Sequence, residues 1–190
     1  MSKKTPTSGR LQLAVIALVF FGPLILATWM YMTGSLTPGG STNHGVLLEP
    51  IMNLGELMPD SAVLAETNGR WVLAYVNMEE CDEACRNDLY RLRQIRLMLG
   101  NDMDRVIRLF LHGDAATDTV FLEDQHQGLK TTNDKGFAAL LRGKRPGGVQ
   151  DDGFYLIDPL SNLVMYFSQD LDPAGVVDDI EHLLELSRIG

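Results

Sequence analysis

The 190-residue chain has only two cysteines, Cys81 and Cys85, and it is short of basic residues. After residue 10, 13 lysines and arginines stand against 25 acidic residues, which leaves a formal charge of −12 on the rest of the chain. So acidic a domain is a poor partner for nucleic acid or anionic lipid headgroups. Internal repeats are also lacking, and the length suits one globular domain with an appendage.

Charge is absent altogether from residues 11–32, a stretch long enough for one helix to cross a bilayer. Three basic residues precede it, and Glu49 is the first charged residue after it. The positive-inside rule therefore predicts a cytoplasmic N-terminus at residues 1–10 and a transmembrane helix at 11–32. A cleaved signal peptide is the alternative, but no clear small-x-small cleavage site follows the apolar stretch.

Glycine, serine, threonine and proline dominate the segment that follows, which predicts a flexible tether at residues 33–46. Residues 47–190 then form the outer domain. We expect a single-pass protein of a bacterial inner membrane, with this domain in the periplasm. In such an oxidising compartment two cysteines can form a purely structural disulfide.

The two cysteines lie between an apolar strand and a helix. Residues 71–78 are rich in β-branched and aromatic side chains, which predicts a strand buried on both faces. Further on, apolar residues recur at the three-to-four spacing that keeps one helical face apolar. The residues of this face are Cys85, Leu89, Leu92, Ile95 and Leu99.

A spacing of four residues brings Cys81 and Cys85 within reach of a disulfide or a shared metal ion. Cys85 continues the buried face, whereas Cys81 lies at the exposed helix N-terminus, where backbone N–H groups stabilise a thiolate. Cys81 is thus the expected reactive sulfur. Four acidic residues between positions 79 and 83 oppose the thiolate and favour a bound cation. A functional dithiol, a structural disulfide and two unpaired thiols all stay open.

A second apolar strand, from Val106 to Leu111, follows the cysteine helix, and this order implies a parallel crossover. Its carboxyl edge would hold both Cys81 and His112. Residues 46–63 indicate an irregular, partly extended lead-in, and residues 118–135 show no strong period. The remaining predictions are a short helix at 135–141, a hairpin of 154–157 with 163–167, and a final helix that starts at Pro173 with Asp172 as its cap.

This order of elements, with cysteines where the first strand becomes a helix, resembles the thioredoxin fold, an α/β class. The outer domain also resembles the membrane-anchored Sco (SenC-like) family, which assists assembly of the copper site of cytochrome c oxidase. The resemblance rests on the anchor, on Cys81-x-x-x-Cys85 after a strand, on Asp114-Ala-Ala-Thr-Asp118-Thr119, and on Tyr155-Leu156-Ile157-Asp158-Pro159.

Two positions depart from the family pattern. Arg86 stands where the family has a proline after the second cysteine, and Gln150 stands near the place of the family's third copper ligand, a histidine. The resemblance implies copper(I) on Cys81 and Cys85. Its third ligand is missing here, and His112, which follows a strand on the same edge of the sheet as the cysteines, is a candidate to replace it. His126 and Met78 are further candidates for that place, and a strand-end histidine bonded to backbone or solvent is the simpler interpretation of His112.

The resemblance implies a role in respiratory oxidase assembly, with an oxidase subunit or another assembly factor as partner. Copper(I) handling through the dithiol is one mechanism. A second is thiol–disulfide exchange, with Cys81 as the attacking sulfur and Cys85 as the resolving one. The third is a non-catalytic scaffold that has lost the metal site.

Overall fold

The computed structural model describes residues 7–33, 43–67, 69–114, 118–149, 152–187 and 189, and it divides the chain into two units at residue 42. The first unit contains helix α1 (Thr7–Met32). Residues 11–30 of this helix have a mean hydropathy of 2.3 and none of them is buried, so α1 is long and apolar enough to cross a membrane. The predicted N-terminal apolar helix is confirmed.

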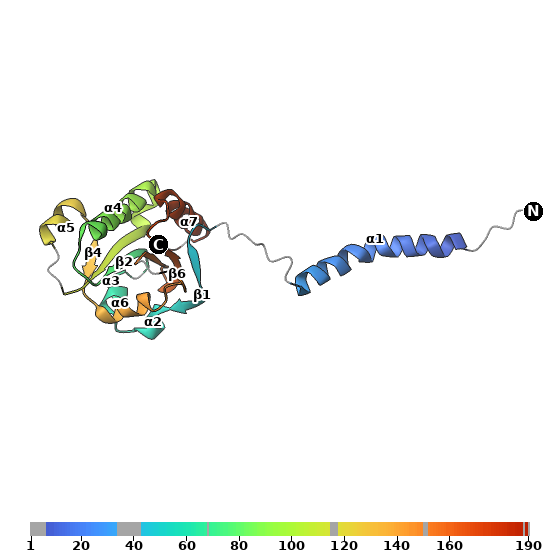
Figure 1. Cartoon of the computed structure of the whole chain (residues 1–190), viewed down its shortest axis with the longest axis horizontal. Coiled ribbons are helices and arrows are strands. Elements are labelled where there is room, and N and C mark those ends of the chain that lie inside the picture. The colour runs from blue at the N-terminus through green and yellow to red at the C-terminus, as the bar shows by residue number, and fades with distance from the viewer. Residues whose placement is uncertain are drawn as a thin grey trace, which may run out of the picture. The chain divides into compact units, whose positions relative to one another are not determined.

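The second unit is built on a six-stranded mixed sheet in the order β1-β6-β5-β2-β3-β4 (Figure 1). Its strands are β1 (Val46–Asn53), β2 (Trp71–Asn77), β3 (Val106–His112), β4 (Lys130–Thr132), β5 (Phe154–Ile157) and β6 (Asn162–Phe167). Parallel pairing joins β2, β3 and β4, whereas β5 pairs antiparallel with both β2 and β6, and β1 pairs antiparallel with β6.

Strand β2 lies at the centre of this sheet, and its first six residues are all buried. Alternate side chains enter two separate cores, as the period of a strand requires. Leu73 and Tyr75 lie in one core, and Val72 and Ala74 lie in the other. The sheet is therefore covered on both faces.

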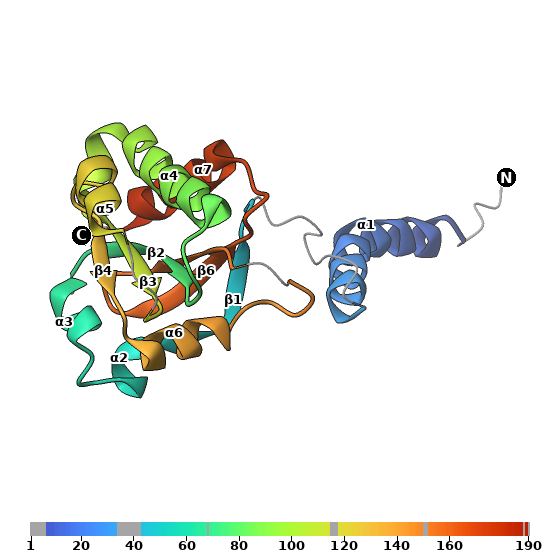
Figure 2. The same ribbon diagram turned by 60° about the vertical axis from the view of Figure 1, so that its left-hand side comes forward.

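Helices form the two outer layers (Figure 2). The buried sides of α4 (Glu83–Met98) and α7 (Pro173–Leu186) pack on the face that holds Tyr75. The other face is covered by α2 (Leu54–Leu57), α3 (Ala62–Thr67) and α6 (Lys135–Arg142). A 3-10 helix, η1 (Gly100–Arg105), and helix α5 (Thr119–Gln125) lie before and after β3 in the chain. This three-layer arrangement confirms the predicted thioredoxin-like α/β fold.

Most of the predicted elements are present. All five residues of the predicted apolar face of α4 are buried, and β2 and β3 are parallel. Residues 154–157 and 162–167 form the antiparallel hairpin. Helix α7 starts at Pro173, and the Asp172 side chain accepts a hydrogen bond from the Ala174 N–H at 3.1 Å, as a cap does.

Two segments differ from their interpretation. Residues 46–63 are partly extended, as predicted, because they contain β1, but they are more regular than expected, because α2 and the start of α3 follow. Residues 118–135 contain α5 and β4. β1 is an edge strand whose side chains are mostly exposed, and β4 is a three-residue edge strand, so neither shows apolar alternation. The predicted tether falls mainly on residues 34–42, outside the described residues, and its last residue, Val46, begins β1.

Packing of α4 on the sheet predicts a contrast between two leucines of that helix. Leu92 is fully buried, whereas Leu97 is 47% exposed. We expect Leu92→Ala to lower the free energy of unfolding by about 2–5 kcal/mol, because it leaves a cavity in a packed core. Leu97→Ala is the matched control and should cost less than about 1 kcal/mol. Urea unfolding of the full chain in maltoside micelles measures both, and equal losses would contradict this assignment of the core.

Candidate functional site

Cys81 and Cys85 form a disulfide at the start of α4, with their Cα atoms 5.1 Å apart. Cys81 precedes the helix and is partly exposed, whereas Cys85 lies in the first helical turn and is 1% exposed. The apolar strand β2 leads directly into this segment. Solvent therefore reaches one sulfur-bearing residue of the pair and not the other, the geometry that a reactive cysteine and a resolving cysteine need.

Asp82 is the N-cap of α4, and its Oδ1 atom accepts a hydrogen bond from the Cys85 N–H at 3.0 Å. A carboxylate at this place satisfies an N–H group that would otherwise be available to a thiolate. Glu83 adds a second negative charge in the first turn. The helix start is therefore occupied by anionic groups, and it offers less stabilisation to a Cys81 thiolate than an uncapped helix would.

His112 lies at the same edge of the sheet as the cysteines, as predicted. It ends β3 and stands opposite Asn77, the last residue of β2. Its Nδ1 atom is 2.8 Å from the Gly113 carbonyl oxygen, and its ring centroid is 5.7 Å from that of Phe110. One ring nitrogen of His112 is thus in contact with the backbone. This agrees with the simpler interpretation, a strand-end histidine bonded to the backbone, rather than with a metal ligand.

Gly113 brings the segments that follow β2 and β3 into close contact. A Cβ atom at this position would lie 2.1 Å from the Met78 carbonyl oxygen, so no residue with a side chain fits there. Met78 packs in the core that α6 covers, on the other side of the sheet from Cys85.

In the described parts of the chain, no group of three or more histidine, cysteine or acidic side chains is close enough to hold a metal ion.

The remaining predicted residues have structural contacts. His126 is buried, its ring packs edge-on against Phe121 at 4.9 Å, and burial, aided by Arg108 and Arg93, lowers its pKa. Asp118 caps α5 by accepting a hydrogen bond from the Phe121 N–H at 3.0 Å, which lowers its pKa.

Arg86, which replaces the family's proline, connects α4 to α5. Its Nη2 atom is 3.1 Å from Asp118 Oδ2, and its guanidinium lies 4.4 Å from the centre of the Phe121 ring. Its own N–H donates to the Asp82 carbonyl at 3.0 Å, a helix bond that proline could not make. The departure from the family pattern thus has a structural role in this chain.

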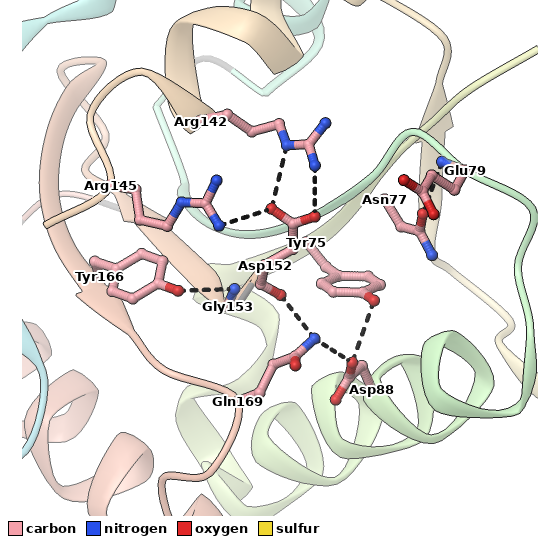
Figure 3. Close-up of polar contacts among 10 residues, drawn as sticks. All are labelled: Tyr75, Asn77, Glu79, Asp88, Arg142, Arg145, Asp152, Gly153, Tyr166 and Gln169. Atoms are coloured by element: carbon pink, nitrogen blue, oxygen red, sulfur yellow. Dashed lines mark hydrogen bonds and ion pairs between the residues drawn. The ribbon is translucent and has the colours of Figure 1, made fainter. Parts of the chain in front are cut away.

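A buried polar network, which the sequence analysis missed, begins at Asp88, one turn after Cys85 (Figure 3). Asp88 Oδ2 accepts hydrogen bonds from the Tyr75 hydroxyl at 3.2 Å and from Gln169 Nε2 at 2.8 Å. Burial, with the Asp88 charge close by, raises the pKa of Tyr75 well above its ordinary value, so the hydroxyl remains a donor. A carboxylate on the otherwise apolar face of α4 was the available sequence signal.

Gln169 extends this network to the loop before β5. Its Nε2 atom also donates to the Asp152 carbonyl at 3.1 Å. The Asp152 carboxylate accepts from Arg142 Nε and Nη2 at 3.2 and 2.8 Å, and Arg145 lies 3.5 Å away (Figure 3). Gln150, near the place of the family's histidine ligand, lies outside the described residues. The network therefore joins the end of that loop to the helix that carries Cys85.

The comparisons with known proteins agree with this fold. A family model described as "Transmembrane-like, thioredoxin-like, C-terminal domain" matches residues 71–187, and one described as "Transmembrane-like, N-terminal domain" matches residues 3–34. No curated protein matches the chain.

Several solved structures are similar to the chain. ScoI of Arabidopsis thaliana, solved with copper bound, has a TM-score of 0.51 at 17% identity, over 65% of this chain and 89% of that one. Apo Sco1 of Thermus thermophilus gives 0.50 at 16%, over 63% and 83%. A SCO1/SenC family lipoprotein of Bacillus anthracis gives 0.50 at 13%, over 64% and 85%. At these identities the likeness establishes a shared fold.

The network makes Asp88 a sensitive position. We expect Asp88→Ala to lower the free energy of unfolding by about 2–3 kcal/mol, because it removes the carboxylate acceptor of the buried Tyr75 hydroxyl and one of the two acceptors of Gln169 Nε2. Glu181→Ala, an exposed carboxylate on α7, is the control and should change stability by less than about 0.5 kcal/mol. Urea unfolding of the full chain tests this, and an Asp88 variant as stable as the control would contradict the role of the network.

Proposed function

The chain belongs to the family of transmembrane-like proteins with a thioredoxin-like C-terminal domain, and on this premise we propose that it assists the assembly of a respiratory oxidase through its Cys81–Cys85 pair. The observation that carries the proposal is this pair itself, one cysteine partly exposed and one buried, where β2 leads into α4 of a Sco-like fold. The uncharged stretch of α1 has three basic residues close before it and none close after it, which supports an outward-facing domain.

Copper(I) is the cargo that we favour. A dithiol reductant, which is itself oxidised to a disulfide, would supply the two electrons and two protons that convert the Cys81–Cys85 disulfide into two thiols. The thiolates derived from these thiols are the soft donors that copper(I) prefers. A Sco protein of the same fold has been solved with copper bound. Negative charge near the pair disfavours two thiolates without a bound cation and so favours the metal-bound form. This charge comes from Glu79, Glu80 and Glu83.

Two protein ligands suit a site that gives up its metal. Among the described residues, no histidine or acidic side chain forms a metal-holding group of three with the pair. A copper(I) ion on Cys81 and Cys85 therefore leaves room for a ligand from the partner, an oxidase subunit or another assembly factor. Exchange of ligands then transfers the ion without any redox step.

A copper(I) competition titration of the reduced full chain in maltoside micelles tests this. We expect one ion per chain, and we expect binding to fall at least about tenfold in the Cys81→Ser, Cys85→Ser double variant, because soft thiolate ligands are lost. His112→Asn, compared with His182→Asn on the exposed side of α7, shows whether the strand-end histidine joins the site. Failure of the reduced chain to bind copper(I) would overturn the metal-handling role.

Thiol–disulfide exchange is the second candidate, and the unequal exposure of the two cysteines favours it. A Cys81 thiolate would attack one sulfur of a partner disulfide, forming a mixed disulfide and releasing the other partner thiolate. Cys85 would then attack Cys81, release the partner as a dithiol and restore the Cys81–Cys85 disulfide. The acidic N-cap at Asp82 opposes the first thiolate, so we rank this candidate second.

Trapping in cells separates the two mechanisms. Under exchange, Cys85→Ser should accumulate mixed disulfides through Cys81, visible as reducible high-mass bands, because the resolving thiol is missing. The double serine variant should show none. If Cys85→Ser also shows none, exchange is excluded. A chain that neither binds copper(I) nor forms adducts, and whose double variant still supports oxidase assembly, acts as a scaffold.

A further inference from the structure

Arg108 is a charged residue in the middle of a buried strand. It belongs to β3, lies on the side of the sheet that α4 covers, and is only 3% exposed. Its Nη2 atom donates to the Gln127 carbonyl at 2.6 Å. Its Nε and Nη1 atoms, both buried, have no hydrogen-bond partner among the residues that the structure describes. A buried guanidinium left in this condition is costly, because it has lost its water without gaining an anion.

Two further arginines surround the same space. A cavity of about 280 Å³ is lined by Arg93 and Arg96 of α4 and by Arg108, and Asp124 and Gln127 line it from the segment around α5. Arg93 Nη1 donates to the Gln125 carbonyl at 2.9 Å, and Arg96 Nε donates to the Val106 carbonyl at 3.0 Å. Backbone contacts thus hold these two guanidinium groups beside the third.

The charges around the cavity do not balance. In the described parts of the chain, no ion pair joins Arg93 or Arg108 to a carboxylate, and only Arg96 has one, with Asp104 at 3.1 Å. Among the described residues that line the cavity, Asp124 is the single carboxylate, against three guanidinium groups. This excess of positive charge arises in a chain whose net charge is −9.

Neighbouring groups do not remove the positive charge. Burial and the two nearby arginines lower the pKa of Arg108 to about 10, so it stays protonated at neutral pH. His126, also buried close by, has a lowered pKa and brings no negative charge. The missing component is therefore an anion.

We propose that Arg93, Arg96 and Arg108 form a local binding site for one small oxyanion of the phosphate type, either free or as a single lipid headgroup, in a domain whose net negative charge disfavours binding to an anionic surface as a whole. A guanidinium presents a planar fork of donors that matches two oxygens of such a group. The cavity has room for a polyatomic anion, and an anion there would offset the positive charge that the three guanidinium groups of the lining bring together. The site is independent of the Cys81–Cys85 chemistry.

Thermal unfolding of the full chain in maltoside micelles, a detergent without phosphate, tests the proposal. Inorganic phosphate should raise the midpoint of wild type in a saturable way at constant ionic strength, because a ligand that binds the folded state stabilises it. Arg108→Met should lose this response, and in chloride alone it should be at least as stable as wild type, because the unpaired charge is gone. Arg70→Gln, an exposed arginine outside the cavity, is the charge-matched control and should respond as wild type does.

A second variant and a second probe complete the test. Arg93→Gln should weaken phosphate binding by roughly tenfold or more in calorimetric titration, and it carries the test if Arg108→Met does not fold. Dihexanoylphosphatidylglycerol below its micellar concentration probes the lipid source, and a saturable response to either probe that requires Arg108 or Arg93 supports the site. No saturable response to either probe, or equal responses in wild type and the arginine variants, would overturn it.

Discussion

The central position of β2 is the constraint on which the rest of the structure depends. Backbone pairing with β3 on one side and β5 on the other satisfies its N–H and C=O groups, so the strand can be buried on both faces. Burial on both faces requires a helical layer above and below the sheet. The chain must then leave the core at Asn77, and it re-enters through α4. The cysteines lie in this exit segment, which explains why one is partly exposed and the other is buried.

Apolar patterning was sufficient to predict the elements that face a core. β2, β3, the hairpin of β5 and β6, α4 and α7 all have such a pattern, and their burial confirms it. Edge strands β1 and β4 have exposed side chains, so their pairing depends on partners far away in the chain. The seven-residue helix α5 contains no buried residue and shows no period either.

The candidate site likewise has one part that the sequence predicted and another that only the folded structure shows. Spacing alone predicted the different exposure of Cys81 and Cys85. Asp88 carried a signal, since it interrupts an apolar face, but nothing in the sequence links it to Gln169 or Asp152. Such contacts depend on three-dimensional proximity between α4, the loop before β5 and the turn after β6. The same holds for Arg108, whose neighbours come from α4 and the segment around α5.

Gly113 shows how tightly the edge beside the cysteines is constrained. Because the Met78 carbonyl fills the space of a Cβ atom, mutation cannot introduce any functional group at position 113 without moving the backbone. In the segment that follows β3, a new functional side chain can therefore appear only on either side of Gly113, at His112 or Asp114. We therefore expect related chains to keep glycine at position 113. The residues on either side are free to differ: His112 now contacts the backbone and Asp114 now pairs with Lys135, and either position could carry a metal ligand instead.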